Sequence, residues 1–345
     1  MNTHVPRMPA EWEPQSAVWL TWPHEAGDWG DDLDAAHACF VDIAHAIAEV
    51  QPVLIVARDA DWASRISTAL EDRPQVRIET YDSNDVWTRD YGPLSVLEGR
   101  DHTGRLVDFR FNGWGGKFRA DRDDRLTAEL HRAGVFGDSP LTSLSQVLEG
   151  GALDTDGLGT LLVRESAVLT QTRNRNLNRA DMESIWRKHL GISRVHWLQH
   201  GRLEGDDTDG HIDTLARFCA PDAIAYQSCD DPNDPHYGPL QAMADELAEM
   251  RTPDGRAYTL IALPMPRPCF AEGRRLPAGY ANFLIINGRV LLPAYAVPED
   301  VEAQARLAAA FPDREIIPID CRALIRQNGS LHCAAMQFHQ SIAIR

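Results

Sequence analysis

Apolar runs and stretches of helical spacing follow one another in a repeating order along this chain. The dipeptide Asn287-Gly288 between two apolar runs favours a tight β-hairpin turn, and an alanine-rich run of helical period comes next. The pattern predicts a unit of strand, strand, helix and strand. Its clearest copy has strands Ala281–Ile286 and Val290–Pro293, helix Glu299–Phe311 and strand Glu315–Ile319.

Four weaker copies of the unit are predicted elsewhere. Their elements are strands 145–153 and 159–169, helix Ala180–Leu190 and strand Val195–Gln199; strands His211–Cys219 and Ala223–Ser228, helix Leu240–Met250 and strand Tyr258–Leu263; strands Gly92–Leu97 and Leu106–Phe111 with helix Asp124–Ala133; and strand Leu331–Phe338, which closes onto strand Ser16–Trp22, helix Leu33–Val50 and strand Val53–Val56. Repeated units of this kind predict a ring of modules whose first strands converge on a central axis.

Polar residues stand at the start of each predicted unit, and a ring would bring them to one point. They are Asp90, Glu149, His211 with Asp213, Asn282 and Cys333. On a strand, His211 and Asp213 leave the same face because side chains alternate. We therefore expect an imidazole beside a carboxylate, with a thiol available to meet them.

Composition narrows the class of protein. The formal net charge of −17 over 345 residues excludes nucleic acid as a partner, because nucleic-acid binding requires a basic surface. The N-terminal Met1–Arg7 lacks the apolar run of a signal peptide, and no stretch reaches the about 20 apolar residues of a membrane span. Six cysteines without a CxxC pair indicate free thiols rather than disulfides or zinc. We expect a cytoplasmic protein with no membrane partner.

Two rival motifs fail on spacing. The glycine-rich Asn112–Phe118 lacks the first glycine of a phosphate loop and the Ser or Thr after its lysine. The acidic runs at Asp206–Gly210 and Asp154–Gly157 do not align with a calcium loop. An ion near Asp206–Asp209 stays open, but no template supports it.

One thiol, one imidazole and several carboxylates fit chemistry on a guanidinium. This planar cation offers N–H donors in a fork that carboxylates accept. Asp90, Glu149 and Asp213 would hold it while the thiolate of Cys333 attacks its central carbon. His211 would protonate departing ammonia and then activate water, which is two-step nucleophilic catalysis.

Six segments carry a family resemblance. They are Pro9–Gln15, Asp85–Pro93, Phe111–Gly116, Glu149–Gly151, Asp207–Asp213 and Leu331–Cys333. In this order, over residues 9 to 337, the chain resembles the agmatine deiminases and related bacterial peptidylarginine deiminases of the guanidino-group modifying superfamily. The resemblance implies a pseudo-symmetric five-bladed α/β propeller, built from strand-strand-helix-strand modules as one catalytic domain over residues 1–345.

The resemblance also implies a site. Cys333 would be the nucleophile, His211 the acid and base, and Asp90, Glu149 and Asp213 the ligands of the guanidinium, with Asn282 at a further active-site position. Trp87 would line the entrance and stack on a cationic tail, or simply pack. We expect no cofactor and no metal, a small cationic guanidino substrate as partner, and a chain compatible with a homodimer.

Plainer interpretations stand beside these. A lone cysteine is most often a small buried apolar residue, Asp90 could pair with Arg89, and Glu149 and Asn282 could belong to ordinary turns. Residues Asn328-Gly329-Ser330 replace a glycine run typical of the agmatine deiminases, and Asp206-Asp207 replaces an Asp-Glu pair.

The motif segments are rich in Asp, Glu and Trp, which suit the amine tail of agmatine better than the carboxylate of arginine. The predicted reaction is hydrolysis of agmatine to N-carbamoylputrescine and ammonia, in polyamine synthesis. Deimination of free or peptidyl arginine, amidino transfer and a non-enzymatic binding module remain as alternatives.

Overall fold

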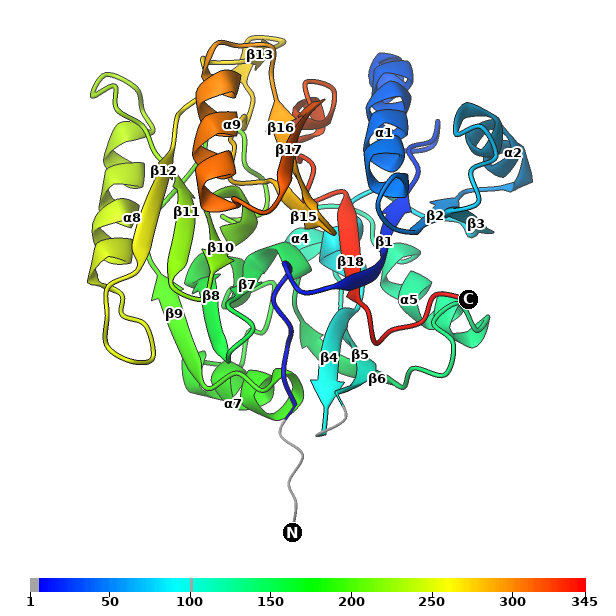
Figure 1. The fold of residues 1–345 in the computed structure, drawn as a ribbon, viewed down its shortest axis with the longest axis horizontal. Coiled ribbons are helices and arrows are strands. Elements are labelled where there is room, and N and C mark those ends of the chain that lie inside the picture. Colours follow the sequence, from blue (N-terminus) through cyan, green and yellow to red (C-terminus); the bar gives the residue numbers. More distant parts are fainter. Residues whose placement is uncertain (1–5, 100–101) are drawn as a thin grey trace.

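The structure, a computed structural model, describes residues 6–99 and 102–345. Within these ranges the chain is a mixed α/β fold of several small mixed sheets, none of which closes on itself. Strands β18, β7 and β15 lie toward the centre of the view, and helices α1, α8 and α9 lie toward its edge (Figure 1). The expectation that the N-terminus lacks a signal peptide rests partly on residues 1–5, which lie outside the described ranges.

Most sheets share one connectivity. A first strand pairs antiparallel with a second, and a helix then leads to a third strand, parallel to the second. The elements are β4 (Leu94–Glu98), β5 (Thr103–Arg110), α5 (Asp123–Arg132) and β6 (Leu141–Val147); β7 (Leu153–Thr155), β8 (Thr160–Arg164), α7 (Arg179–Leu190) and β9 (Arg194–Leu198); β10 (Ala216–Ala220), β11 (Ala223–Gln227), α8 (Tyr237–Glu249) and β12 (Thr259–Leu263); and β15 (Leu284–Ile286), β16 (Arg289–Ala294), α9 (Glu299–Ala310) and β17 (Glu315–Asp320).

The two ends of the chain build the remaining large sheet together. The C-terminal β18 (Ala335–His339) pairs antiparallel with β1 (Gln15–Thr21), as predicted, and places Met336 opposite Trp19. This sheet continues through α1 (Leu33–Ala48), β2 (Val53–Ala57), α2 (Ala60–Ala69) and β3 (Val76–Thr80).

Short elements connect these sheets. They are η1 (Gly30–Asp32), α3 (Thr88–Tyr91), α4 (Gly113–Gly116), η2 (Gly150–Ala152), α6 (Glu165–Val168), η3 (Ile212–Thr214), the hairpin of β13 (Phe270–Ala271) and β14 (Arg274–Arg275), and η4 (Leu324–Gln327). Across the described ranges, no helix combines the length and apolar character needed to cross a membrane.

Burial and capping explain why these segments form. Strand β2 is apolar and buried at all five positions, as expected for an inner strand covered on both faces. Helix α7 begins with a capping box between Asn178 and Asp181 and ends at Gly191, whose φ of 75° is the left-handed conformation that glycine adopts without strain.

Four predicted strands are wrong in their extent. The predicted strand His211–Cys219 is a 3-10 turn at Ile212–Thr214 followed by β10, because Thr214 Oγ1 donates 2.9 Å to the His211 carbonyl and bends the backbone. His211 and Asp213 therefore do not alternate on a strand face. The predicted strand Leu331–Phe338 begins only at Ala335, after the turn that holds Cys333.

The predicted strands 145–153 and 159–169 fail for a related reason. Residues up to Val147 belong to β6 of the preceding sheet, and the chain then turns at η2 because Gly151 N–H donates 2.9 Å to the Asp90 carboxylate. Strand β8 ends at Arg164, where α6 begins.

The corrected boundaries reveal a regularity. Each first strand is preceded by a short turn that carries one of the polar residues singled out from the sequence. Asp90 precedes β4, Glu149 precedes β7, His211 precedes β10, Asn282 precedes β15 and Cys333 precedes β18. Turns are free to aim polar side chains, because the strands behind them fix their ends.

Candidate active site

Cys333 lies at the centre of the polar residues. Its side chain is buried, and its Sγ lies 3.3 Å from Asn282 Nδ2 and 3.7 Å from Asp213 Oδ2. Asn282 Oδ1 accepts the backbone N–H groups of His332 at 2.9 Å and Cys333 at 3.3 Å. Asn282 therefore fixes the turn that presents the thiol.

Asp90 is held from two sides. Its Oδ2 accepts from Trp114 Nε1 at 2.8 Å, and its Oδ1 accepts from Gly151 N–H at 2.9 Å. Burial raises the pKa of Asp90, the charge of His211 opposes this and Asp213 adds to it, so that the pKa is about 6.

His211 is fully buried and sits between carboxylates. Its Nδ1 lies 3.5 Å from Asp90 Oδ1, and its Nε2 lies 3.8 Å from Glu149 Oε2. Burial alone lowers the pKa of His211, but the negative charges of Asp90, Glu149 and Asp213 outweigh burial and raise it to about 9. The imidazole is therefore protonated at neutral pH, as a proton donor must be.

Glu149 has a partner that the sequence did not point to. Arg173 Nε donates to both of its oxygens, at 2.8 and 3.0 Å, and Arg173 NH1 reaches Asp209 at 2.6 Å. Burial raises the pKa of Glu149, but hydrogen bonding and charge from His211 and Arg173 bring it below its ordinary value. Asp209 also pairs with Lys117 at 2.8 Å, so its carboxylate already has two cationic partners within the protein.

The glycine-rich segment owes its glycines to a left-handed turn. Gly113, Trp114 and Gly115 have φ of 67°, 53° and 82°, a conformation that glycine adopts readily and tryptophan rarely. The turn aims the indole N–H at Asp90. The sequence flagged this motif but assigned no task to Trp114.

A cavity leads outward from Cys333 and Asp90. Its aromatic lining is Trp87, Trp114 and Phe118, and its acidic lining beyond Asp90 is Asp28, Asp85 and Asp207. No lysine or arginine lines it within the described part of the chain. Burial, followed by the charges of Asp28 and Asp207, raises the pKa of Asp85 to about 7. Such a cluster of acids favours a cation.

The loop that departs from the family pattern forms one wall of this cavity. The Trp87 ring packs against Gly329 so closely that any Cβ there would overlap it. Asn328 has φ of 66°, a left-handed conformation that Asn tolerates. Its Nδ2 donates to Asp207 Oδ2 at 2.8 Å, so Asn328 fixes the position of one of the acids that line the cavity.

The site has more negative than positive charge around the thiol. Burial, then Asp213 and Asp90, raise the pKa of Cys333 well above its ordinary value. Three buried atoms nearby have no hydrogen-bond partner: both ring nitrogens of His211, and Asp213 Oδ1. Because unpaired buried polar atoms are costly, the free Oδ1 of Asp213 calls for an N–H donor, and the surplus of negative charge calls for a cation.

The structure thus places every residue singled out from the sequence at one site. Cys333, His211, Asp213, Asp90, Glu149 and Asn282 contact one another directly or through a neighbour, and Trp87 lines the cavity above them. Within residues 6–99 and 102–345, no group of three or more His, Cys, Asp or Glu is arranged to hold a metal ion.

Known proteins include clear relatives of this chain. The sequence profile of the Porphyromonas-type peptidyl-arginine deiminases matches residues 7–338. The chain belongs to this family. Among its relatives, agmatine deiminase of Stutzerimonas stutzeri is 36% identical, with 96% of this chain and 94% of that protein covered.

Solved structures of the family superpose closely on the chain. A Cys-to-Ser variant of C. jejuni agmatine deiminase with substrate bound has a TM-score of 0.92 at 33% identity, covering 99% of both chains. A Porphyromonas gingivalis protein with a provisional arginine deiminase name has a TM-score of 0.93 at 46% identity, covering 99% of this chain and 100% of that one.

Gly151 gives a direct test of the packing at the site. A Cβ there would lie 2.7 Å from His211 Nδ1, 2.8 Å from Asp90 Oδ1 and 3.0 Å from Asp213 Oδ2. We expect Gly151→Ala to lower kcat/KM by about 10²-fold, since displacements of about 1 Å cost this much. Gly238→Ala on α8 is the control, because its Cβ meets nothing within 4 Å. Steady-state kinetics that show equal activity for both variants would contradict the described geometry.

Proposed function

We propose that this protein is an agmatine deiminase, which hydrolyses agmatine to N-carbamoylputrescine and ammonia. The observation that carries the proposal is the buried thiol of Cys333 among carboxylates and unpaired polar atoms, beneath an acidic and aromatic cavity. The names of the relatives support the same activity.

The proposed reaction begins with the guanidinium between Asp90, Asp213 and Glu149, above Cys333. Its positive charge lowers the pKa of the Cys333 thiol, which releases its proton to solvent and becomes the thiolate. The sulfur attacks the central carbon and gives a tetrahedral adduct. His211 then passes its proton to one amino group, which leaves as ammonia, and a thiouronium remains on Cys333.

The second half reverses the role of His211. The neutral imidazole accepts a proton from water while the oxygen attacks the same carbon. The carbon–sulfur bond then breaks, the departing sulfur takes up the proton of the new hydroxyl group, and the product carries a neutral ureido group beside the regenerated thiol. One water enters and one ammonia leaves, so atoms balance, and no cofactor takes part.

The residues that line the cavity favour a substrate with an amine at its far end. Asp28, Asp85 and Asp207 line the cavity beside Trp87, and acids and an aromatic face suit a cationic tail. A free α-carboxylate would be repelled there. The P. gingivalis neighbour, at 46% identity, bears an arginine deiminase name, which makes arginine and arginyl peptides the necessary comparison substrates.

The proposal extends to architecture. The shared sheet connectivity supports a five-bladed, pseudo-symmetric propeller, with the turns that carry the site gathered on its axis. It also supports one catalytic domain over residues 1–345. A homodimer, a cytoplasmic location and a role in putrescine synthesis stay predictions.

Cys333→Ser should abolish turnover and leave the fold intact, because a serine hydroxyl has too high a pKa to attack without a stronger base. Cys269→Ser is the control, since this thiol is only partly buried and lies outside the cavity that reaches Cys333. Ammonia release and circular dichroism are the measurements. Substantial activity in Cys333→Ser would show that the nucleophile is another group.

The protonation of His211 predicts how kcat/KM depends on pH. Its pKa is raised to about 9 in the folded enzyme, so the proton needed by departing ammonia is present below that pH and is lost above it. We expect kcat/KM to fall as pH rises through about 9. An alkylguanidine without the amine separates this loss from titration of the substrate tail. Full activity retained well above pH 9 would contradict the role of His211.

The preference of the enzyme for agmatine or arginine tests the role of the acids that line the cavity. We expect kcat/KM for agmatine to exceed that for free arginine by at least about 10²-fold, the scale of roughly 3 kcal/mol between a matched tail and an unpaired charge. Asp207→Asn should narrow this ratio, whereas Asp230→Asn, an exposed acid outside the cavity, should leave it unchanged. Competitive kinetics with both compounds and an arginyl peptide decide between them. Equal or faster turnover of arginine or of the peptide would show that agmatine is not the preferred substrate.

A further inference from the structure

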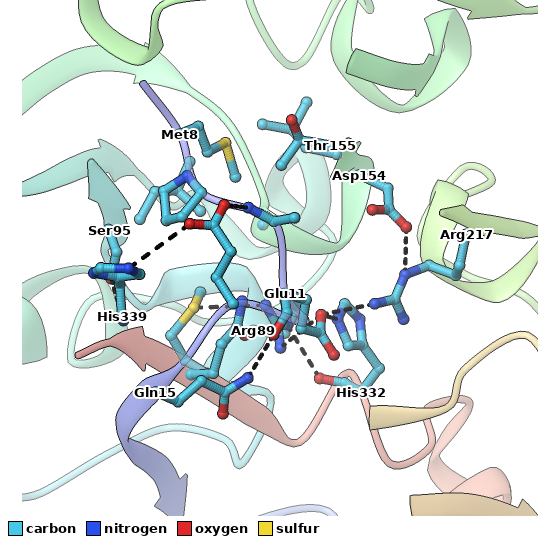
Figure 2. A pocket seen from close by; sticks show the side chains of 18 residues that line it. Met8, Glu11, Gln15, Arg89, Ser95, Asp154, Thr155, Arg217, His332 and His339 are labelled. Carbon is cyan, nitrogen blue, oxygen red and sulfur yellow. Dashed lines mark hydrogen bonds and ion pairs between the residues drawn. The ribbon is translucent and has the colours of Figure 1, made fainter. Parts of the chain in front are cut away.

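A second, narrow cavity lies on the other side of the residues that carry the chemistry. Arg89 and His332 line it, while their chain neighbours Asp90 and Cys333 line the cavity proposed for substrate. Figure 2 shows Glu11 between Arg89, His332 and Arg217 in this second cavity. Glu11 comes from the N-terminal motif Pro9–Gln15, to which the proposed reaction gives no task.

His332 is clamped between two carboxylates. It is buried, its Nδ1 lies 2.8 Å from Asp213 Oδ2, and its Nε2 lies 2.8 Å from Glu11 Oε2. Ionised carboxylates only accept hydrogen bonds, so both ring nitrogens must donate, and only imidazolium does so. The geometry therefore requires a positively charged His332 as long as both acids are ionised.

Both acids are held ionised. Burial raises the pKa of Asp213, but hydrogen bonding and charge from His332, with charge from His211, outweigh burial and bring the pKa below its ordinary value. Burial also raises the pKa of Glu11, but Arg217, His332 and Arg89 bring it far below its ordinary value. A partner cation thus compensates each buried charge, as buried ions require.

Glu11 is itself fixed rigidly. Its Oε2 accepts from Arg217 NH2 at 2.7 Å, and its Oε1 accepts from the backbone N–H of Ile285 at 2.7 Å. Arg217 in turn donates to Asp154 at 2.5 Å and to the Phe283 carbonyl at 2.9 Å. The groups that face His332 are therefore three anions, Glu11, Asp154 and Asp213, and two cations, Arg89 and Arg217.

Asp213 divides its two oxygens between these surroundings and the site. Oδ2 accepts from His332 and lies 3.7 Å from Cys333 Sγ, while Oδ1 is buried without a partner. The contact with His332 fixes the orientation of the carboxylate plane and leaves the other oxygen free for a guanidinium N–H.

We infer that Glu11 and His332 are positioning residues for the proposed deimination: Glu11 keeps His332 positively charged, and His332 keeps Asp213 ionised and correctly oriented beside Cys333. The inference rests on the proposed function for its kinetic consequence only. The N-terminal segment, far from Cys333 in sequence, thereby becomes part of the machinery that prepares the site.

Glu11→Gln tests this inference with little change of shape. The amide keeps the shape of the carboxylate but removes the negative charge beside His332 Nε2 and Arg217, so His332 would lose its proton more readily. Asp213 would lose its cation and take up a proton more readily. We expect kcat to fall by about 10-fold to 100-fold, with the acid limb of the kcat/KM profile moving up by about one pH unit.

Glu13→Gln is the matched control. Glu13 lines the same cavity but pairs with Arg7 and the Ala10 N–H and does not contact His332. Its substitution should leave both kcat and the acid limb unchanged. A Glu11→Gln variant that loses activity without a shift of the acid limb, or that keeps full activity, would overturn the inference.

A substrate-free readout separates this inference from the proposed function. Side-chain ¹⁵N NMR of His332 should show an N–H on both ring nitrogens in the wild-type protein, as its two carboxylate contacts require, and on one ring nitrogen only in Glu11→Gln. A neutral His332 in the wild-type protein would refute the inference even if the variant did not fold. If neither agmatine, arginine nor an arginyl peptide releases ammonia, the proposed function fails while the NMR result still decides the inference.

Discussion

The structure depends on a shortage of positive charge at a buried site. Asp90, Asp213 and Cys333 are removed from water, and His211 supplies one proton among several carboxylates. Burial of uncompensated charge is expensive, and this raises the pKa of Asp90 to about 6 and that of Cys333 further above its ordinary value. A guanidinium brings both the missing charge and the missing N–H donors, so binding the substrate and activating the thiol are one event.

Charges behind the site limit this shortage. Arg173 balances Glu149 and Arg217 balances Glu11, while His332 contacts both Glu11 and Asp213. Asp90, in front of Cys333, has no arginine or lysine as a hydrogen-bond partner and accepts from Trp114 and the Gly151 N–H instead. A guanidinium relieves the unfavourable electrostatics of the acids beside Cys333, which is how binding energy serves catalysis rather than affinity alone.

Much of this arrangement is readable from the sequence. The Asn287-Gly288 turn and the helical period after it locate one module correctly, and the same order recurs elsewhere. Cys333, His211 and the carboxylates stand out because each interrupts an apolar pattern at the start of a module. Their roles remain proposals, but the structure brings them together.

Other features could not be read in advance, for physical reasons. The strand predicted through His211 gives way to a 3-10 turn, since side-chain hydrogen bonds override local alternation. Arg173 and Glu11 meet their partners across 24 and 321 residues of chain, and no local pattern marks such contacts. Trp114 lies in a left-handed turn, a conformation that its residue type disfavours.

The central claim is that Cys333 becomes covalently attached to the guanidino carbon. Acid quenching of the enzyme during turnover of agmatine, followed by peptide mass spectrometry, measures this directly. The account predicts a peptide containing Cys333 with the added mass of agmatine less one ammonia, absent in Cys333→Ser. An unmodified Cys333 peptide throughout turnover, or the adduct on another cysteine, would contradict it.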